Sequence, residues 1–520
     1  MESQWQESAV EMALRNPIIL TEILKRFPLK NCRLVCQFWN KMVVSLPNAR
    51  LALNMKNGVN STRFFEFFFK LDGQLAKRIS TRCFIAPDDE EPTHWIDTFA
   101  YKLAHICDKF SDNVQILEIT ITYSACLQPI FQILKNCCPN LKQLEINYEA
   151  NEDESDFSTE ILPLPLPLKP KLTLLTVTSE AQVTPSFTRI LQLVINASPN
   201  LREATLPWGF YPDLSNSKLL DSLTVEMNIV RPFKEVLAEF KPSELSNLLN
   251  QVGDQLVNLS FSCANNSGLP TMYEVDDWND LNLTRFHFPR KMSKLQKFEN
   301  NLLDVFQHQR LDIKRLPALK TLLIGNVSEE SRGVDELLEN IYQSKKVFVS
   351  VRNLAILAIQ DPELLEGLKT AFPNLEKLEL DTGCKIDFDG ATGMMELDEV
   401  FNVCKGLEGL KHLNLALPQF SKPTLNVVQT LFDRADLYKR LKTLEIFIYM
   451  RIKVRGDLTE EEMELFKKLI VAMNAMDRVT IRNFYFSKES LRDLLDFMVS
   501  NKMSVDKFRM FQGGSVGISS

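Results

Sequence analysis

The sequence predicts an α/β solenoid, in which a short strand and a helix repeat along the chain and each repeat packs only on its neighbours. The first observation is a recurring phrase, Leu-x-x-Leu-x-Leu, which is clearest at 140–146, 374–380, 409–415 and 440–446. The second is the spacing, because looser copies place its first residue roughly 19 to 36 residues apart, a period typical of solenoids. The third is the length of 520 residues, which is too great for one compact globule.

The other half of each repeat is predicted to be a helix. Three helical patterns run into the sequence Pro-Asn-Leu, at 139–141, 199–201 and 373–375. Proline moves the residue before it out of the α region, so the helix ends there, and asparagine then tolerates the turn. Leucine begins the strand. Successive strands are therefore expected to pair as a parallel sheet on the concave side of a horseshoe, with the helices on the convex side.

The leucine-rich-repeat solenoid is expected to span residues 48–486. Its first repeats, at 48–112, are irregular, and two stretches rich in acidic residues, at 147–170 and 262–281, are expected to be loop insertions. Residues 487–520 are expected to form a capping helix and a tail. Because repeats need neighbours to complete their core, the array is expected to fold as a unit.

The composition disfavours nucleic acids and membranes as partners. A net charge of -7 disfavours a nucleic-acid-binding surface, which is normally basic. No apolar run approaches the ~18 residues of a membrane span, and the N-terminus lacks a basic start followed by an apolar run. The ten cysteines form no Cys-x-x-Cys pair and are expected to be reduced thiols. We therefore expect a cytoplasmic or nuclear protein with no nucleic-acid or membrane partner.

The sequence lacks two common catalytic signatures. It has no phosphate-binding Gly-rich loop and no His-Glu-x-x-His, and its five histidines share no ligand spacing. Residues 385–396 imitate a calcium loop, but Lys385 stands where the first carboxylate should be. We expect no catalytic residue, no metal site and no cofactor.

The candidate substrate-binding surface is the outward side of the predicted strands. Side chains alternate along a strand, so the second and third leucines of each phrase point inward and the residues between them point outward. Several outward glutamates predict an acidic face suited to a basic partner, and the alternative is a merely solvated strand face. Trp208, directly after a strand, either anchors a partner at the rim or is buried in the turn. The candidates are Glu145, Glu203, Trp208, Arg285, His287, Glu379, His412 and Glu445.

Residues 12–47 form a predicted two-helix motif ahead of the repeats. Asn16 is a good N-cap and Pro17 suits the first helical position. Pro28 ends this helix, and Asn31 can cap a second one. Two amphipathic helices of this size cannot bury their apolar faces alone, so they must dock on the solenoid, on a partner, or on both.

The sequence RLVCQFWN at 33–40, together with Pro17 and the Ile-Leu pair at 23–24, resembles an F-box. With the repeats behind it, the chain resembles the FBXL-type substrate receptors of SCF ubiquitin ligases. The link between Phe27 and Arg33 is shorter than is usual in that family. The alternative interpretation is a two-helix cap that seals the first repeat.

The resemblance implies that the N-terminal motif binds a Skp1-type adaptor and that the repeats bind a protein substrate. The cullin–RING complex would then bring the ubiquitin-charged enzyme to that substrate, and the chain itself would not be an enzyme. The alternative is a leucine-rich-repeat scaffold with a decayed F-box and no ubiquitin role. The residues that the resemblance assigns to adaptor binding are Pro17, Leu20, Ile23, Leu24, Leu34, Val35 and Trp39.

Overall fold

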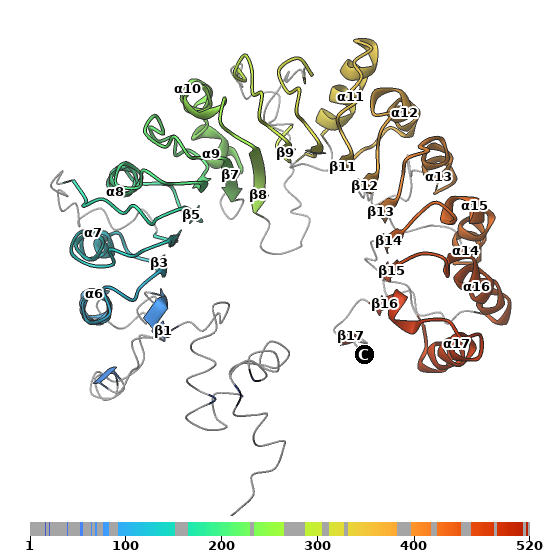
Figure 1. Cartoon of the computed structure of the whole chain (residues 1–520), viewed down its shortest axis with the longest axis horizontal. Helices are drawn as coiled ribbons and strands as arrows, with labels where there is room; N and C mark the ends of the chain where they lie inside the picture. Colours follow the sequence, from blue (N-terminus) through green and yellow to red (C-terminus); the bar gives the residue numbers. More distant parts are fainter. Residues whose placement is uncertain are drawn as a thin grey trace, which may run out of the picture. The chain divides into compact units, whose positions relative to one another are not determined.

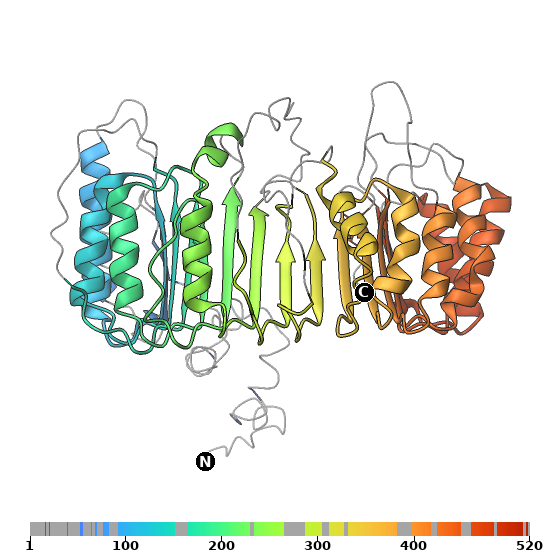
Figure 2. The ribbon, with the colours of Figure 1, turned by 90° about the horizontal axis from the view of Figure 1, so that it is seen from above.

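The computed structural model shows two compact units, residues 1–220 and residues 221–520, and each is described here by itself. In each unit, parallel strands lie on the inner side and helices on the outer side (Figures 1 and 2). The predicted leucine-rich-repeat solenoid is therefore confirmed as the fold. The described residues are 16, 20, 39, 53–55, 64, 68–69, 76–82, 92–150, 165–228, 233–264, 287–303, 311, 313–326, 331–381, 397–417, 424–448, 459–482, 486–512 and 516–517.

The first unit contains a sheet whose described strands pair in parallel and in chain order. The outer layer of this unit includes three α-helices and a 3-10 turn. The strands are β1 (Leu53–Met55), β2 (Arg78–Arg82), β3 (Ile116–Ile121), β4 (Gln143–Tyr148), β5 (Leu174–Ser179) and β6 (Glu203–Pro207). The helical elements are α6 (Pro92–Lys109), η2 (Ser124–Cys126), α7 (Leu127–Asn136) and α8 (Pro185–Asn196).

The second unit continues the same pattern, with parallel pairing in chain order from its first strand to β16. A last short strand, β17 (Val516–Gly517), pairs antiparallel with β16. The parallel strands are β7 (Ser222–Asn228), β8 (Asn258–Ala264), β9 (Lys297–Asn300), β10 (Thr321–Ile324), β11 (Asn353–Leu357), β12 (Lys377–Asp381), β13 (His412–Leu417), β14 (Thr443–Ile448), β15 (Arg478–Arg482) and β16 (Phe508–Gln512).

The outer layer of the second unit is formed by short helices. None of the helices in the described part of the chain is long and apolar enough to cross a membrane. The helices are α9 (Phe233–Ala238), α10 (Pro242–Val252), α11 (Gly333–Gln343), η4 (Pro362–Gly367), α12 (Leu368–Ala371), α13 (Leu397–Gly406), α14 (Thr424–Asp433), α15 (Ala435–Tyr438), α16 (Glu460–Met473), α17 (Lys488–Ser500) and η5 (Val505–Lys507).

The leucine phrase forms the core between the two layers. In β4 the side chains alternate between buried and half-buried, and Leu141, Leu144 and Ile146 are at most 2% exposed. The neighbouring strand buries Leu172, Leu175 and Val177 in the same way, in register with β4. A leucine of one repeat therefore lies beside the leucine at the same position of the next, and each repeat completes the apolar core of its neighbour.

The asparagines of the three Pro-Asn-Leu turns connect neighbouring repeats. Asn140 donates its side-chain amide to the carbonyl of Asp112 at 2.8 Å, and Asn200 donates to Pro170 at 2.8 Å. In the second unit, Asn374 donates to the carbonyl of Val349 at 2.9 Å. Each acceptor lies just before the strand of the preceding repeat. The sequence predicted only that asparagine tolerates the turn. In the structure its side chain also donates a hydrogen bond to a turn carbonyl and so links two neighbouring repeats.

A buried lysine holds an unusual turn at the end of α7. Cys138 has a φ of 57°, in the left-handed region that costs a non-glycine residue on the order of 1–3 kcal/mol. Its N–H donates to the Ser111 hydroxyl at 3.0 Å. The ammonium of Lys169 donates to the carbonyls of Cys137 and Cys138 at 2.6 and 3.2 Å. Lys169 is 3% exposed, and this burial lowers its pKa.

The placement of Lys169 changes the interpretation of the predicted loop at 147–170. Residues 147 and 148 belong to β4, and residues 151–164 lie outside the described residues. Of residues 165–170, Leu166 and Lys169 are buried and the other four are exposed. Of the other predicted insertion, 262–281, residues 262–264 belong to β8 and the rest lie outside the described residues.

Two repeats were misplaced by the leucine pattern. The copy at 283–288 is not the strand that follows β8. That strand is β9, whose phrase has Leu295, Phe298 and Asn300, so its third leucine is replaced by a buried asparagine. At the other end, β16 continues the ladder beyond the expected boundary at 486, because Phe508 and Met510 stand where the pattern requires leucine.

The thiols in the described part of the chain are all free. Five of these six cysteines, Cys107, Cys126, Cys137, Cys138 and Cys404, are buried, and Cys263 is half-buried. Burial raises the pKa of Cys404 to about 12, so this thiol remains protonated at neutral pH. These side chains act as small apolar residues of the core.

Replacing Lys169 with methionine should destabilise the first unit. The variant keeps the aliphatic stem but leaves the carbonyls of Cys137 and Cys138 without their charged donor. Because hydrogen bonds to charged groups contribute about 1.5–3 kcal/mol each, we expect the free energy of unfolding to fall by about 2 kcal/mol. Urea denaturation followed by circular dichroism measures this. Lys171→Met, which removes an exposed donor to Asn140, is the control, and an equal loss in both variants would contradict the role of Lys169.

Candidate functional site

The inner strand face of the first unit contains a row of polar side chains, two of which are glutamates. In register, Ser80, Glu118, Glu145, Thr176 and Thr205 follow one another across β2 to β6. Glu118 and Glu145 are therefore direct neighbours, and like charges in this position repel. An ion pair between Arg78 and Glu118 offsets part of this repulsion.

Glu145 has no such partner within the described residues. Burial is the main cause that raises its pKa, the neighbouring Glu118 raises it further, and Arg78 lowers it. Beside these residues, Thr178 donates its hydroxyl hydrogen to Asn147 at 3.0 Å, and Asn147 donates to Glu149 at 2.8 Å. Glu149 also pairs with Arg82 at 2.9 Å. The face of the first unit thus has two groups of paired polar side chains and one poorly compensated carboxylate, Glu145.

The corresponding face of the second unit carries matched charges. Glu299 pairs with Lys297 at 2.7 Å, and Glu379 pairs with Lys377 at 3.4 Å, each within one strand. Glu445 of β14 pairs across to Arg482 of β15 at 2.8 Å. Nδ1 of His412 lies 2.9 Å from the hydroxyl oxygen of Thr443 on the next strand. Exposed pairs of this kind contribute at most about 1 kcal/mol each to stability, so they are open to exchange with a partner.

Most of the predicted outward residues occupy the expected face. Glu145, Glu379, His412 and Glu445 are half-buried on strands and Glu203 is exposed on β6. The predicted acidic character is wrong in part, because Glu118, Glu379 and Glu445 are each paired with a cation. Sequence inspection missed these partners, since Arg78 and Arg482 lie one repeat away from the glutamates that they neutralise. Arg285 lies outside the described residues.

His287 is not on the strand face. It precedes β9, and its backbone N–H donates to the hydroxyl of Ser246 on α10 at 3.2 Å, which places it beside the outer helix layer. The prediction was wrong because it assigned the strand to 283–288, and the true strand of this repeat begins at Lys297.

Trp208 does not offer a surface for a partner. It is 3% exposed and Phe210 is 2% exposed. Gly209, with a φ of 84°, turns the chain between them, and the N–H of Phe210 donates back to the carbonyl of Pro207 at 3.2 Å. This turn folds both aromatic side chains into the core. Of the two alternatives that the sequence allowed, rim anchor and burial, the structure selects burial.

Few of the residues assigned to adaptor binding are described. The N–H of Leu20 donates to the carbonyl of Asn16 at 2.9 Å, as expected of a helix that begins there. Leu20 is fully buried within this chain, and its assignment to adaptor binding stays a prediction. Trp39 is helical and half-buried. Pro17, Ile23, Leu24, Leu34 and Val35 lie outside the described residues.

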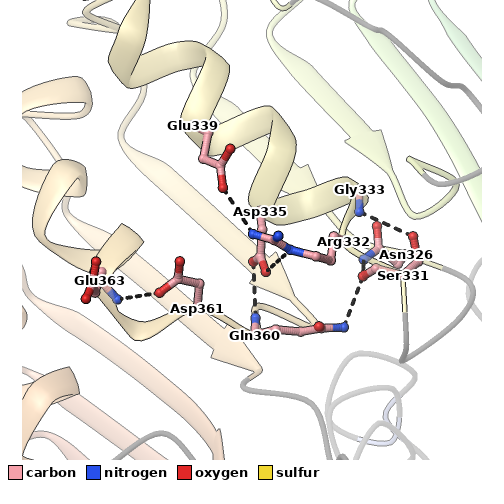
Figure 3. Close-up of polar contacts among 9 residues, drawn as sticks. All are labelled: Asn326, Ser331, Arg332, Gly333, Asp335, Glu339, Gln360, Asp361 and Glu363. Carbon is pink, nitrogen blue, oxygen red and sulfur yellow. Dashed lines mark hydrogen bonds and ion pairs between the residues drawn. The ribbon is translucent and has the colours of Figure 1, made fainter. Parts of the chain in front are cut away.

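A second cluster surrounds the buried carboxylate of Asp335, in the first turn of α11 (Figure 3). Asp335 is 1% exposed, and its Oδ1 accepts the N–H of Gln360 at 3.1 Å. Its Oδ2 has no hydrogen-bond partner among the described residues and lies 3.9 Å from Nε of Arg332. The side chain of Gln360 in turn donates to the carbonyl of Ser331 at 3.1 Å. The cluster therefore connects the segment after β10 to the segment after β11.

The contacts of this cluster hold two neighbouring repeats together. Burial raises the pKa of Asp335, against the opposing effect of backbone N–H groups of Gln360 and Asp361 and the charge of Arg332. The partial positive charge at the start of α11 also favours a carboxylate here. No group of three histidine, cysteine or acidic side chains in the described part of the chain is arranged to hold a metal ion.

No protein-family model matches the chain, and no curated protein matches it by sequence. Among solved structures, a protein from Bacteroides fragilis aligns with 58% of this chain and 68% of its own, at 16% identity and a TM-score of 0.31. A chain of the yeast complex of Rad7 and Elc1 aligns with 88% of this chain and 98% of its own, at 12% identity and a TM-score of 0.30. These low values assign the chain to no family and to no function.

Replacing Glu145 with glutamine should stabilise the first unit at neutral pH. Folding raises the pKa of Glu145, so the wild type loses stability as the pH rises from below the usual value of 4.5 through the raised one. Neutral glutamine avoids this loss. We expect a gain of a few tenths of a kcal/mol at about pH 7, the size of a cross-strand like-charge pair, and none near pH 4.

Urea denaturation at the two pH values measures this difference. Glu203→Gln, on the exposed position of β6, is the control and should change little. A Glu145→Gln variant that is less stable than the wild type at neutral pH would show that the carboxylate is stabilising instead.

Replacing Asp335 with alanine should destabilise the second unit, because the N–H of Gln360 loses its acceptor. The expected loss is about 1–3 kcal/mol in the free energy of unfolding, as for other buried groups left unpaired. Asp335→Asn retains an acceptor oxygen and should lose less. Thermal and urea unfolding measure both variants. Glu336→Ala, at the exposed neighbouring position, is the control, and a loss as large as that of Asp335→Ala would argue against the cluster.

Proposed function

We propose that the chain is the substrate-recognition subunit of an SCF-type E3 ubiquitin ligase. The N-terminal motif would bind a Skp1-type adaptor, and the repeats would bind a protein substrate. Two features support this proposal: the resemblance of residues 12–47 to an F-box, and the solenoid that follows. The observation that carries the substrate-binding half is the inner face, where polar side chains from consecutive strands lie in registered rows.

The composition of that face favours a protein partner. It has cations and hydroxyls within one row, for example Lys377, His412 and Thr443 followed by Arg478, and carboxylates and an amide within another, for example Glu379, Asn414 and Glu445. Such a mixture provides both donors and acceptors, as protein surfaces require. Because the surface pairs are individually weak, a partner can replace them without a large cost. Extended surfaces of this kind are the usual binding sites of solenoids.

In this proposal the chain performs no bond chemistry. It would hold the substrate at a high effective concentration near the ubiquitin-charged enzyme that the cullin–RING complex brings. No cofactor is needed for that role, and the expected locations are the cytoplasm and the nucleus. Trp39, which is half-buried, remains a candidate contact for the adaptor, together with the assigned residues of the motif that lie outside the described part. Leu20 would support the motif from within the chain.

The alternative function is a leucine-rich-repeat scaffold that binds a protein and has no ubiquitin role. The short link between Phe27 and Arg33 and the complete burial of Leu20 favour it. Both functions share the inner face as the surface for the partner, so adaptor binding separates them.

The test is capture of a purified Skp1-type adaptor in complex with its cullin by the purified full-length chain. We expect the wild type to retain the complex, and Leu24→Asp and Trp39→Asp to weaken retention by about tenfold or more, because a charge would enter an apolar interface. Val499→Asp, at an exposed apolar position of α17, is the matched control. Circular dichroism would show that each variant is folded. Failure of the wild type to retain the complex would remove the ligase proposal and leave the scaffold.

A further inference from the structure

All segments that lead into the strands of the second unit lie along one edge of its sheet. The strands are parallel, so their N-terminal ends meet at the same edge, and Figure 2 shows this edge at the bottom of the view, below the arrowheads of β7 and β8. We call the segments before β9 to β14 the basic edge: residues 287–296, 313–320, 344–352, 373–376, 405–411 and 439–442. Neighbouring strands lie about 4.8 Å apart, so six strands give an edge of roughly 25 Å.

The basic edge is strongly cationic in a chain whose net charge is -7. Its six segments contain fourteen lysines and arginines and two acidic residues, Glu376 and Glu408. Glu376 is already shared by Arg352 at 3.2 Å and Lys411 at 2.9 Å, and these cations lower its pKa. Exposed cations of the edge that have no ion pair within the described residues include Arg290, Lys291, Lys294, Arg315, Lys345 and Lys442.

Helix termini account for only part of this charge. Cations near a helix C-terminus are stabilised by its partial negative charge, which accounts for Lys405 in the last turn of α13 and for Lys345 directly after α11. The effect fades within one turn. Arg352 lies well beyond the end of α11 at Gln343, and Lys442 lies directly before β14, after α15 has ended at Tyr438. The concentration of cations therefore exceeds what the helices themselves favour.

The middle of the basic edge also exposes apolar side chains. Val347 is 39% exposed and Val349 is 55% exposed, between Lys345 and Arg352. Apolar side chains within a charged surround are typical of protein interfaces. A nucleic acid held by its phosphates gains nothing from valine, and unstacked bases require aromatic surfaces. Within the described segments of this edge, Val347 and Val349 are the exposed large hydrophobic residues, and neither is aromatic.

We propose that the basic edge binds an acidic protein segment that also carries apolar residues. An extended segment of about seven residues spans the six strands. Its carboxylates pair with cations such as Lys291, Arg315 and Lys345, and its apolar side chains contact Val347 and Val349. This surface is separate from the inner strand face. It rests on the proposed function only in taking the partner to be a protein.

The experiment measures fluorescence anisotropy of labelled twelve-residue peptides with the full-length chain at about 50 mM and about 300 mM salt. The probes are (Glu-Glu-Leu)4, (Glu-Glu-Gly)4 and a single-stranded and a double-stranded DNA of the same length. We expect the leucine peptide to bind most tightly and to weaken with salt, because exposed charges are screened. The triple variant Lys291→Glu, Arg315→Glu, Lys345→Glu should lose about tenfold or more in affinity.

A matched control reverses three exposed cations elsewhere in the same unit: Lys468→Glu, Lys488→Glu and Arg492→Glu, on α16 and α17. This variant has the same net charge as the triple variant and should bind like the wild type. Val347→Ser with Val349→Ser should bring the leucine peptide down to the affinity of the glycine peptide. Circular dichroism checks that each variant is folded.

Three results would overturn the proposal: no binding of either peptide at low salt, equal losses in the two triple variants, or tighter binding of either DNA than of the leucine peptide. Adaptor capture by the triple variant separates this proposal from the proposed function. If the triple variant still captures the adaptor but no longer binds the leucine peptide, the result supports the basic edge as a surface separate from the adaptor-binding motif. If the wild type fails to capture the adaptor, the proposed function fails, and the peptide measurements still test the basic edge.

Discussion

The parallel register of the leucine phrase is the constraint on which the rest of the structure depends. Each strand receives its backbone hydrogen bonds from the strands of neighbouring repeats, and its leucines are buried beside the leucines of the same position. A slip of one residue would turn every leucine to solvent. Once the register is fixed, residues at equivalent positions form rows, so a charge at one position of a repeat has a predictable neighbour in the next.

Three other features follow from this register. The turn asparagines donate to the preceding repeat because successive turns lie at the same height. Lys169 reaches the end of α7 because the segment before β5 lies beside the one before β4. Glu118 and Glu145 are forced together by the same geometry. One constraint therefore produces stabilising links between repeats and, in the same sheet, an electrostatic cost.

The strict copies of the phrase were predicted correctly from the sequence, and the altered ones were not. The strands after Leu141, Leu375, Leu410 and Leu441 are all present, and the segment 487–520 contains the expected helix, α17. The strand β9 was missed because Asn300 replaces a leucine and caps its own turn, with Oδ1 accepting the N–H of Leu302 at 3.0 Å. The pattern finds strands whose buried positions are leucines. It misses a strand in which a buried position is an asparagine that accepts a backbone hydrogen bond.

The sequence alone determined the class of fold and the direction in which most strand residues point, because both follow from local spacing and from the alternation of a strand. Only the tertiary structure decided which charges neutralise one another, since Glu445 and Arg482 are far apart in sequence and meet through strand pairing. It also decided that Trp208 is buried and that cations of separate loops share one edge. These outcomes depend on contacts between repeats, which a single repeat does not encode.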